Sequence, residues 1–141
     1  MAAFNKFNSF VEALAEKVHN LGSDTLKVYL SNATPSASAD LVKADLAEIS
    51  AGNGYTAGGN QATISSSSQT SGTYKLVLAD PATWTASGGS IGPFQYAVLY
   101  NDTAANDELI GWWDYGSAVT LNAGETFTVD FDASTGVLTI A

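Results

Sequence analysis

The sequence FQYAVLYNDTAANDELIGWWDYG, residues Phe94–Gly116, carries the clearest structural signal in the chain. Its first part, Phe94–Tyr100, has the alternation of a β-strand, in which neighbouring side chains point to opposite faces. One face carries Phe94, Tyr96, Val98 and Tyr100, and the other carries Ala97 and Leu99. Because both faces are apolar, the pattern predicts a central strand that is covered on both sides. A turn-rich loop at 101–107 then leads into a second strand at 108–115.

Outward from this pair of strands, short apolar segments alternate with turns. Further strands are predicted at 25–30, 62–67, 73–79, 83–87, 118–121, 126–131 and 137–140. Their spacing of about 8–12 residues is typical of an antiparallel sandwich or barrel. Between the first two strands, we expect a loop at 31–40 and a short helix at 40–49. A glycine-rich loop follows at 51–60 and holds Tyr55, and the four serines at Ser65–Ser68 are too short a run to indicate disorder.

The N-terminal region differs from the rest, because its apolar residues recur at spacings of three and four. This stripe predicts an amphipathic helix over 9–21. Its members are Phe7, Phe10, Val11, Leu14, Val18 and Leu21. Ser9 and Glu12 match a capping box, and Gly22 supplies a stop at the C-terminal end. His19 falls on the opposite, polar side of the helix and is expected to be exposed.

The fold class is therefore predicted as mainly β, in the sense of a β-rich α+β protein. The expected architecture is an antiparallel β-sandwich or barrel with an N-terminal amphipathic helix or arm. Residues 1–22 are assigned to the arm and helix, and residues 23–141 to a single β-sandwich-like domain. A chain of 141 residues is long enough for one such domain, since it buries about two-thirds of its unfolded surface.

The formal net charge is −9, and it is unevenly distributed. Residues 1–75 hold six acids and five lysines, whereas residues 76–141 hold eight acids and no basic residue. A nucleic acid or an anionic membrane surface would be repelled by this half, because binding to either rests on basic side chains. We therefore expect neither nucleic acid nor membrane among the partners.

The sequence contains no motif for catalysis, metal binding or a cofactor. It has no cysteine and one histidine, which leaves no thiolate nucleophile and makes a zinc site improbable. Asp130 and Asp132 begin like a calcium loop, but the glycine comes one position late. The acids Asp107, Glu108 and Asp114 would suit a glycosidase only across a cleft, which a sequence does not show. We therefore expect no catalytic residues, no metal and no cofactor.

The candidate interface residues are aromatic and aliphatic. They are Phe4, Phe7, Phe10, Val11, Leu14, Tyr55, Trp112 and Trp113. On a strand, Trp112 and Trp113 point to opposite faces, so that one can fill the core while the other is either covered by a second layer or exposed to a partner or sugar. The three N-terminal phenylalanines are either helix core or an apolar leader that docks on another subunit.

Four stretches, taken in order, resemble the head decoration or cement proteins of tailed bacteriophages. They are SDTLKVYLSNATPSASADLV at Ser23–Val42, AEISAGNGYTAGGNQATI at Ala47–Ile64, the Phe94–Gly116 stretch with its YAVLYND…LIG…DYG pattern, and GETFTVDFDASTGVLTI at Gly124–Ile140. Together they cover most of the chain. The helical opening, Phe4–Leu21, matches least.

The resemblance implies a non-enzymatic capsid protein that binds the major capsid protein lattice and stabilises the head. It implies a place on the outer capsid surface of the virion, after synthesis in the host cytoplasm, and self-association as a homotrimer, since closed symmetric oligomers are usual in such assemblies. It carries over no functional residue, because the group is defined by its overall pattern. An alternative is a tail or head-fibre component that binds a receptor or glycan through Trp112 or Trp113. A small hydrolase that uses an acid pair is the least favoured reading.

Overall fold

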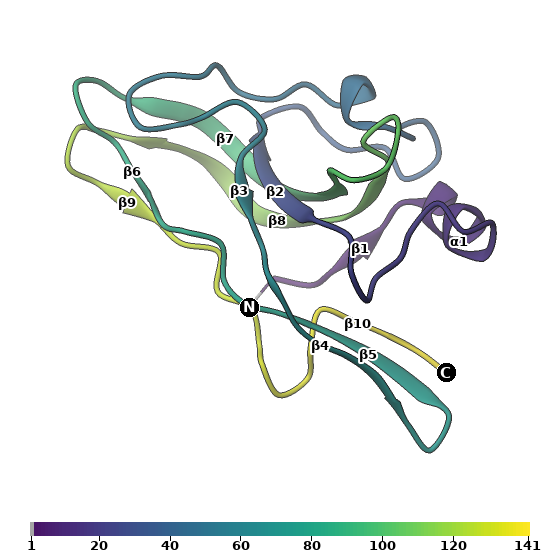
Figure 1. Cartoon of the computed structure of the whole chain (residues 1–141). Coiled ribbons are helices and arrows are strands. Elements are labelled where there is room, and N and C mark those ends of the chain that lie inside the picture. Colours follow the sequence, from purple (N-terminus) through teal and green to yellow (C-terminus); the bar gives the residue numbers. More distant parts are fainter. Residues whose placement is uncertain (1) are drawn as a thin grey trace.

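The computed structural model describes residues 2–141 and shows a mainly β protein with an N-terminal helix (Figure 1). The strands are β1 (Asn5–Lys6), β2 (Leu26–Ser31), β3 (Asn60–Gln61), β4 (Ile64–Thr70), β5 (Thr73–Leu78), β6 (Trp84–Thr85), β7 (Ile91–Asn101), β8 (Leu109–Leu121), β9 (Thr126–Phe127) and β10 (Leu138–Ile140), with helix α1 at Asn8–Ala15 and a 3₁₀ turn at Lys43–Asp45. All strand pairs are antiparallel. The sandwich-like architecture expected from the strand spacing is confirmed.

The largest sheet has five strands in the order β1-β8-β7-β2-β3, so β7 is central as predicted. Its residues from Tyr96 to Tyr100 are all buried, which confirms that both faces are covered. The alternation is not continuous, however. The pairing register of β7 with β8 shifts between Phe94 and Tyr96, and the expectation that Phe94 shares a face with Tyr96 is wrong. Phe94 instead packs on the face of Ala97 and Leu99, because the bulge turns the chain by one position.

One face of the five-stranded sheet packs against the two smaller sheets. These are the three-stranded sheet β10-β5-β4 and the two-stranded ribbon β6-β9 (Figure 1). The core between them contains Leu26, Val28, Leu30, Leu76, Leu78, Trp84, Ile91, Leu99, Trp113 and Leu138. Trp84 is 1% exposed and faces the rings of both Tyr55 and Phe127. We call this the sandwich face.

The other face of the same sheet is covered by the chain between β2 and β3. Its core contains Phe7, Tyr29, Leu46, Tyr96, Val98, Tyr100 and Leu109. The hydroxyl of Tyr29 donates to the carbonyl of Leu46 (2.9 Å), and that of Tyr100 donates to Gly58 (2.8 Å). Side-chain bonds to backbone therefore hold this irregular covering segment against the sheet. We call this the tyrosine face.

A buried tyrosine fixes the glycine-rich loop. The Tyr55 hydroxyl accepts the N–H of Leu30 on β2 (3.0 Å) and donates to Oε1 of Glu48 (2.7 Å), which also accepts the N–H of Gly58 (2.6 Å). Burial is the main cause that raises the pKa of Tyr55 far above its usual value. Gly59 follows with φ +73°, and a Cβ at this position would collide with the carbonyl of Val28. The loop therefore depends on glycine where it passes the backbone of β2.

The N-terminal helix is shorter than predicted. α1 ends at Ala15, and Lys17 adopts a positive φ of 70°, which turns the chain out of the helix well before Gly22. The N-cap is Phe7 and makes no side-chain capping bond, so the expected capping box of Ser9 and Glu12 is not formed.

The early end of α1 changes the environment of His19. The expectation of an exposed histidine is wrong: His19 is 5% exposed, packs on Phe10 and lies with Nδ1 3.0 Å from the amide nitrogen of buried Asn101. The same amide nitrogen donates to Asp24 (2.7 Å). Burial lowers the pKa of His19, and the charges of Glu108 and Asp24 oppose this effect.

The helix expected over 40–49 is also absent, and only the 3₁₀ turn Lys43–Asp45 forms. The carboxylate of Asp45 accepts the N–H groups of Leu41 (3.0 Å) and Val42 (3.1 Å). Aspartate side chains that capture nearby amides compete with helical hydrogen bonding. These bonds also lower the pKa of Asp45.

The N-terminal segment joins the five-stranded sheet. β1 pairs with β8, with Asn5 opposite Trp112, and the N–H of Phe7 donates to the carbonyl of Ile110 (3.2 Å). Phe7 is fully buried and packs on Trp112, with ring centroids 4.6 Å apart. Gly111 provides the space for this arrangement, since a Cβ there would collide with the ring of Phe4.

Candidate functional site

Exposed large apolar side chains are few, and most of them line surface hollows. Among residues 2–141 they are Val11 (53% exposed), Leu41 (50%), Tyr115 (60%) and Ile140 (42%). Val11 and Ile140 line one groove, and Tyr115 lines a separate pocket. Concentrated exposed apolar surface is typical of interaction sites.

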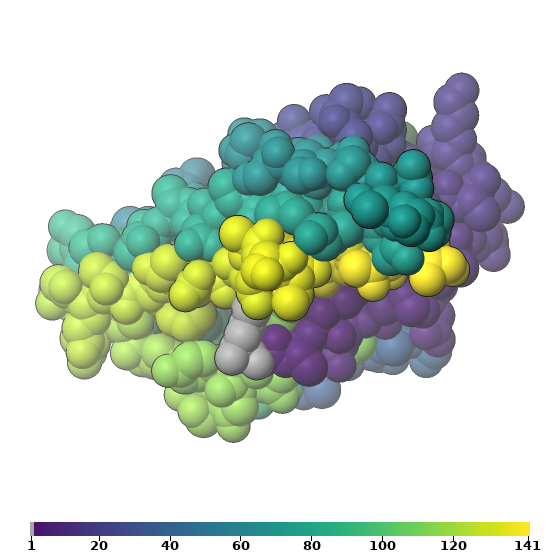
Figure 2. Space-filling model, turned by 90° about the horizontal axis from the view of Figure 1, so that it is seen from below, coloured from purple at the N-terminus to yellow at the C-terminus, as the bar shows by residue number. Residues whose placement is uncertain are grey.

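The first hollow is a groove between α1 and β10, which we call the α1–β10 groove. It has a volume of about 540 Å³ and is lined by Phe4, Lys6, Phe10, Val11, Leu14 and residues 137–140. Seen from below in Figure 2, the yellow C-terminal strand lies between the teal β4–β5 region and the purple N-terminal segment. The groove therefore lies between two sheets, with β1 at the edge of one and β10 at the edge of the other.

Local sequence explains why this groove stays apolar. Helix α1 turns Phe10 into the core, where it is 4% exposed, and this leaves Val11 and Leu14 on the groove side. On β10, Leu138 is buried opposite Leu76, whereas Ile140 at the end of the chain is exposed. Lys6 is the one charged side chain that lines the groove within the described residues.

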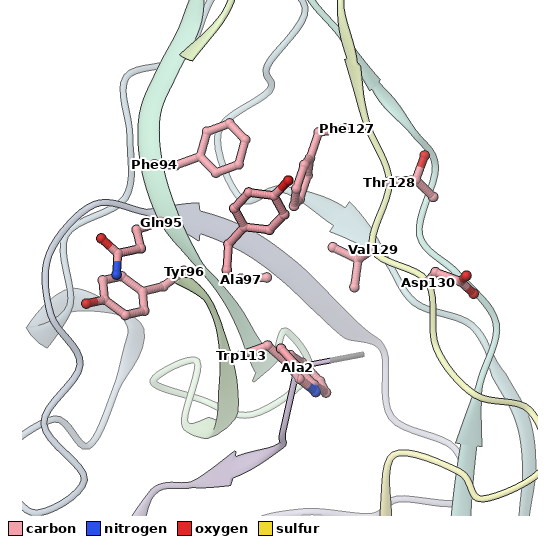
Figure 3. Close-up of a pocket in the computed structure, with 11 residues that line it drawn as sticks. Ala2, Phe94, Gln95, Tyr96, Ala97, Trp113, Phe127, Thr128, Val129 and Asp130 are labelled. Carbon is pink, nitrogen blue, oxygen red and sulfur yellow. The ribbon is translucent and has the colours of Figure 1, made fainter. Parts of the chain in front are cut away.

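The second hollow lies between β7–β8 and the segment that follows β9, and we call it the β7–β9 pocket. Its volume is about 290 Å³. Figure 3 labels the lining residues Ala2, Phe94, Gln95, Tyr96, Ala97, Trp113, Phe127, Thr128, Val129 and Asp130, and Tyr115 also lines the pocket. The rings of Phe94 and Phe127 meet edge to face at 4.8 Å. The side chains of Thr128 and Asp130 point away from these rings (Figure 3), so the pocket offers a ligand mainly apolar contact.

The structure distributes the eight candidate interface residues over different environments. Phe7, Phe10, Tyr55 and Trp113 are buried within the chain, and Trp112 is half-buried against Phe7. Phe4, Val11 and Leu14 come together at the α1–β10 groove, where Phe10 also contributes to the wall. The expected opposite orientation of Trp112 and Trp113 is confirmed, since they pack on the tyrosine face and the sandwich face respectively.

Two residues of the hollows, Tyr115 and Ile140, were not expected from the sequence. Val11 and Ile140 line the same groove because α1 lies beside β10. The strand alternation along 137–140 does not show this position of the helix. Tyr115 follows two tryptophans on β8, and nothing in the sequence distinguishes it as the exposed member of the three.

Two further findings on the described residues concern metal ligands and membrane-spanning helices. Among residues 2–141 there is no group of three or more metal-ligating side chains. Within the same range, no helix is long and apolar enough to cross a membrane. Lys43 and Glu48 form an ion pair (2.7 Å), and the Lys43 ammonium lies 4.9 Å from the ring centre of Tyr29. These groups hold the covering segment of the tyrosine face in place.

Comparison with known protein families, curated proteins and solved structures found no match to this chain.

Proposed function

We propose that this chain is a non-enzymatic assembly protein of a bacteriophage head, which binds the major capsid protein lattice and stabilises it. The observation that carries the proposal is the α1–β10 groove, an apolar surface with Val11 and Ile140 exposed along its length. Burying such a surface against a neighbouring protein is favourable by roughly 25 cal/mol per Å² of apolar area. We take this neighbour to be the major capsid protein, because the four sequence stretches resemble the head decoration proteins of tailed bacteriophages.

The charge distribution supports the outer surface of the capsid as the location. Residues 76–141 carry eight acids and no basic residue. Packaged DNA would repel this acidic part of the chain. On the outside of the shell, the acidic residues are not close to DNA phosphates. The resemblance implies a homotrimer for this role.

The first experiment measures the copy number of this chain in purified virions, relative to the major capsid protein, by quantitative mass spectrometry. A ratio near one, or a simple fraction such as one-third, supports a shell-covering protein. A handful of copies per particle would place the chain at a vertex, tail or fibre instead. Complete absence from virions would overturn the proposal.

A second experiment tests the groove itself. Val11→Asp and Ile140→Asp place carboxylates on its two sides, and each is expected to lower occupancy on capsids at least about tenfold, because a charge in an apolar interface loses its hydration. The matched control is Leu41→Asp, which changes an equally exposed apolar residue outside the groove. Removing residues 1–8 is not a clean test, because it deletes the fully buried Phe7. Equal occupancy of the groove and control variants would exclude the groove as the contact.

The alternative of a receptor- or glycan-binding module has no specific observation in its favour. It was based on an exposed tryptophan face, and Trp113 is 6% exposed while Trp112 packs on Phe7. The β7–β9 pocket has aromatic walls, but sugars also require several convergent polar groups.

A further inference from the structure

The six strands that end a sheet differ greatly in length. β1, β3, β6 and β9 have two residues each, and β10 has three. β4 is the exception, with seven residues from Ile64 to Thr70 at the outer end of the order β10-β5-β4. Very short edge strands protect a protein from pairing with other chains, and the five short strands follow this rule. β4 does not.

The backbone of β4 is positioned to pair outward. Thr70 and Thr73 flank a two-residue turn at Ser71–Gly72 and form the first pair of the β4–β5 ladder. Because hydrogen-bonded and non-bonded positions alternate along an antiparallel ladder, Ser68 bonds to β5, whereas Ser67 and Gln69 direct their N–H and C=O groups away from it. These outward groups form an unpaired row that a further strand can complete.

β4 also lacks the side chains that usually block a sheet edge. It contains no proline and no charged residue, and the register irregularity between Ile64 and Ser66 affects only its first residues. Lysine, proline and inward charges are the common protective devices at edges. The side chains of β4 are serine, glutamine and threonine and are mostly exposed, so they can form cross-strand hydrogen bonds with a similar strand.

The distribution of charge favours the β4 strand of a second copy as the strand that pairs with this edge. The segment from Ile49 to Tyr74 contains no charged residue, although the chain as a whole carries −9. Two copies that approach through most of their surface repel each other, especially through residues 76–141. β4 lies within the longest uncharged stretch of the chain, so two copies that meet through it bring few like charges together.

We infer that β4 is a self-association surface, through which two copies of this chain pair antiparallel across a two-fold axis and join their three-stranded sheets into one sheet of six strands. An interface of this kind is isologous, since the same strand serves both copies. The β4–β5 hairpin extends away from the five-stranded sheet in Figure 1, which leaves space for a second copy beside it. The inference does not depend on capsid binding. It gives a dimer in place of the homotrimer that the resemblance implies, and it is tested on the purified protein alone.

The test has two arms. Analytical ultracentrifugation over a range of concentrations measures the oligomer directly. We expect a dimer whose dissociation constant rises at least about tenfold in Gln69→Glu, because two carboxylates are then brought to the joined edges. Gln69 lies opposite the uncharged Tyr74, and a glutamate can still accept the N–H of Gly72. Gln61→Glu is the matched control, since it makes the same substitution at an exposed position of the edge strand β3, and it should leave the dimer unchanged.

The second arm uses the absence of native cysteine. Single cysteines are introduced at positions 65 to 69 and at Thr85, and each variant is oxidised with glutathione disulfide. Two-fold pairing predicts intermolecular disulfides that peak at one position of β4, with none at Thr85. A monomer at all concentrations would overturn the inference. So would a trimer or dimer that is insensitive to Gln69→Glu and shows no cross-link peak along β4.

Discussion

The five-stranded and three-stranded sheets share one core but differ in how much of each sheet is covered by the rest of the chain. The five-stranded sheet is covered on both faces, and its edge strands β1 and β3 have two residues each. The three-stranded sheet contributes Leu76, Leu78 and Leu138 to the core, but β4 is largely exposed and β10 borders the α1–β10 groove. The first sheet is therefore expected to hold most of the stability, whereas the second contributes the long exposed edge of β4 and one wall of the α1–β10 groove.

The largest expected effect tests whether the N-terminal segment belongs to the stable sheet. Phe7→Ala removes a fully buried ring that packs on Trp112. Truncating a buried phenylalanine costs about 3–5 kcal/mol, so urea unfolding should show a loss of this size. Val11→Ala, four residues on and half exposed, serves as the control and should cost less than about 1 kcal/mol. A Phe7→Ala variant of nearly wild-type stability would show that the segment is a detachable arm.

A smaller effect is expected when the same substitution, tyrosine to phenylalanine, is made at a residue bonded to the five-stranded sheet and at one within the three-stranded sheet. Tyr55→Phe leaves the buried N–H of Leu30 without its acceptor and removes the donor to Glu48. An unsatisfied buried group costs about 1–3 kcal/mol, and we expect thermal unfolding to register that loss. In the three-stranded sheet, Tyr74→Phe removes only a bond to the hydroxyl of Ser67 (2.9 Å), and its cost should be below about 1 kcal/mol. Equal losses in the two variants would contradict the division between the sheets.

The sequence predicted the regular parts of the fold better than the places where side chains bond to backbone. The central position of β7 follows from its two apolar faces, and the opposite orientations of Trp112 and Trp113 follow from strand geometry. Phe94 was placed on the wrong face because a bulge is a feature of strand pairing, which local alternation does not report. The helix over 40–49 was wrong because Asp45 bonds to the amides of two preceding residues, and this competes with the apolar periodicity.

The candidate site shows the same limit. The apolar N-terminal stripe identified Val11 and Leu14, which lie at the α1–β10 groove. It did not separate them from Phe7 and Phe10, because spacing alone does not tell which side of a helix meets the sheet. The prediction for His19 is wrong for a related reason. It assumes that the helix continues to residue 21, but α1 ends at Ala15, so His19 does not lie on the polar side of a helix and is buried.

The smallest expected effect concerns the junction of the two sheets, where His19 lies. Its ring meets Asn101 of β7 in the five-stranded sheet and borders a hollow shared with Tyr74 and Ile140 of the three-stranded sheet. Burial lowers the pKa of His19, so the unfolded chain takes up a proton at a higher pH than the folded chain does. Protonation therefore favours unfolding, and the stabilising effect of the neutral ring is complete only above the unfolded pKa of about 6.5.

As the pH falls from 6.5 to 5, we expect the free energy of unfolding to decrease by at most about 1.4 kcal/mol per pH unit, which is the limit for one proton. Asp24 and Glu108 reduce the slope below this limit, because their charges favour the protonated ring. The carboxyls of Asp45 and Asp132, whose pKa values are lowered by backbone hydrogen bonds, lose their contribution only at more acid pH. His19 is the one histidine in the chain, so His19→Gln should remove the slope in urea titrations across this range. An unchanged slope in the variant would assign the pH dependence to the carboxyls instead and would show that the junction does not respond to the charge of His19.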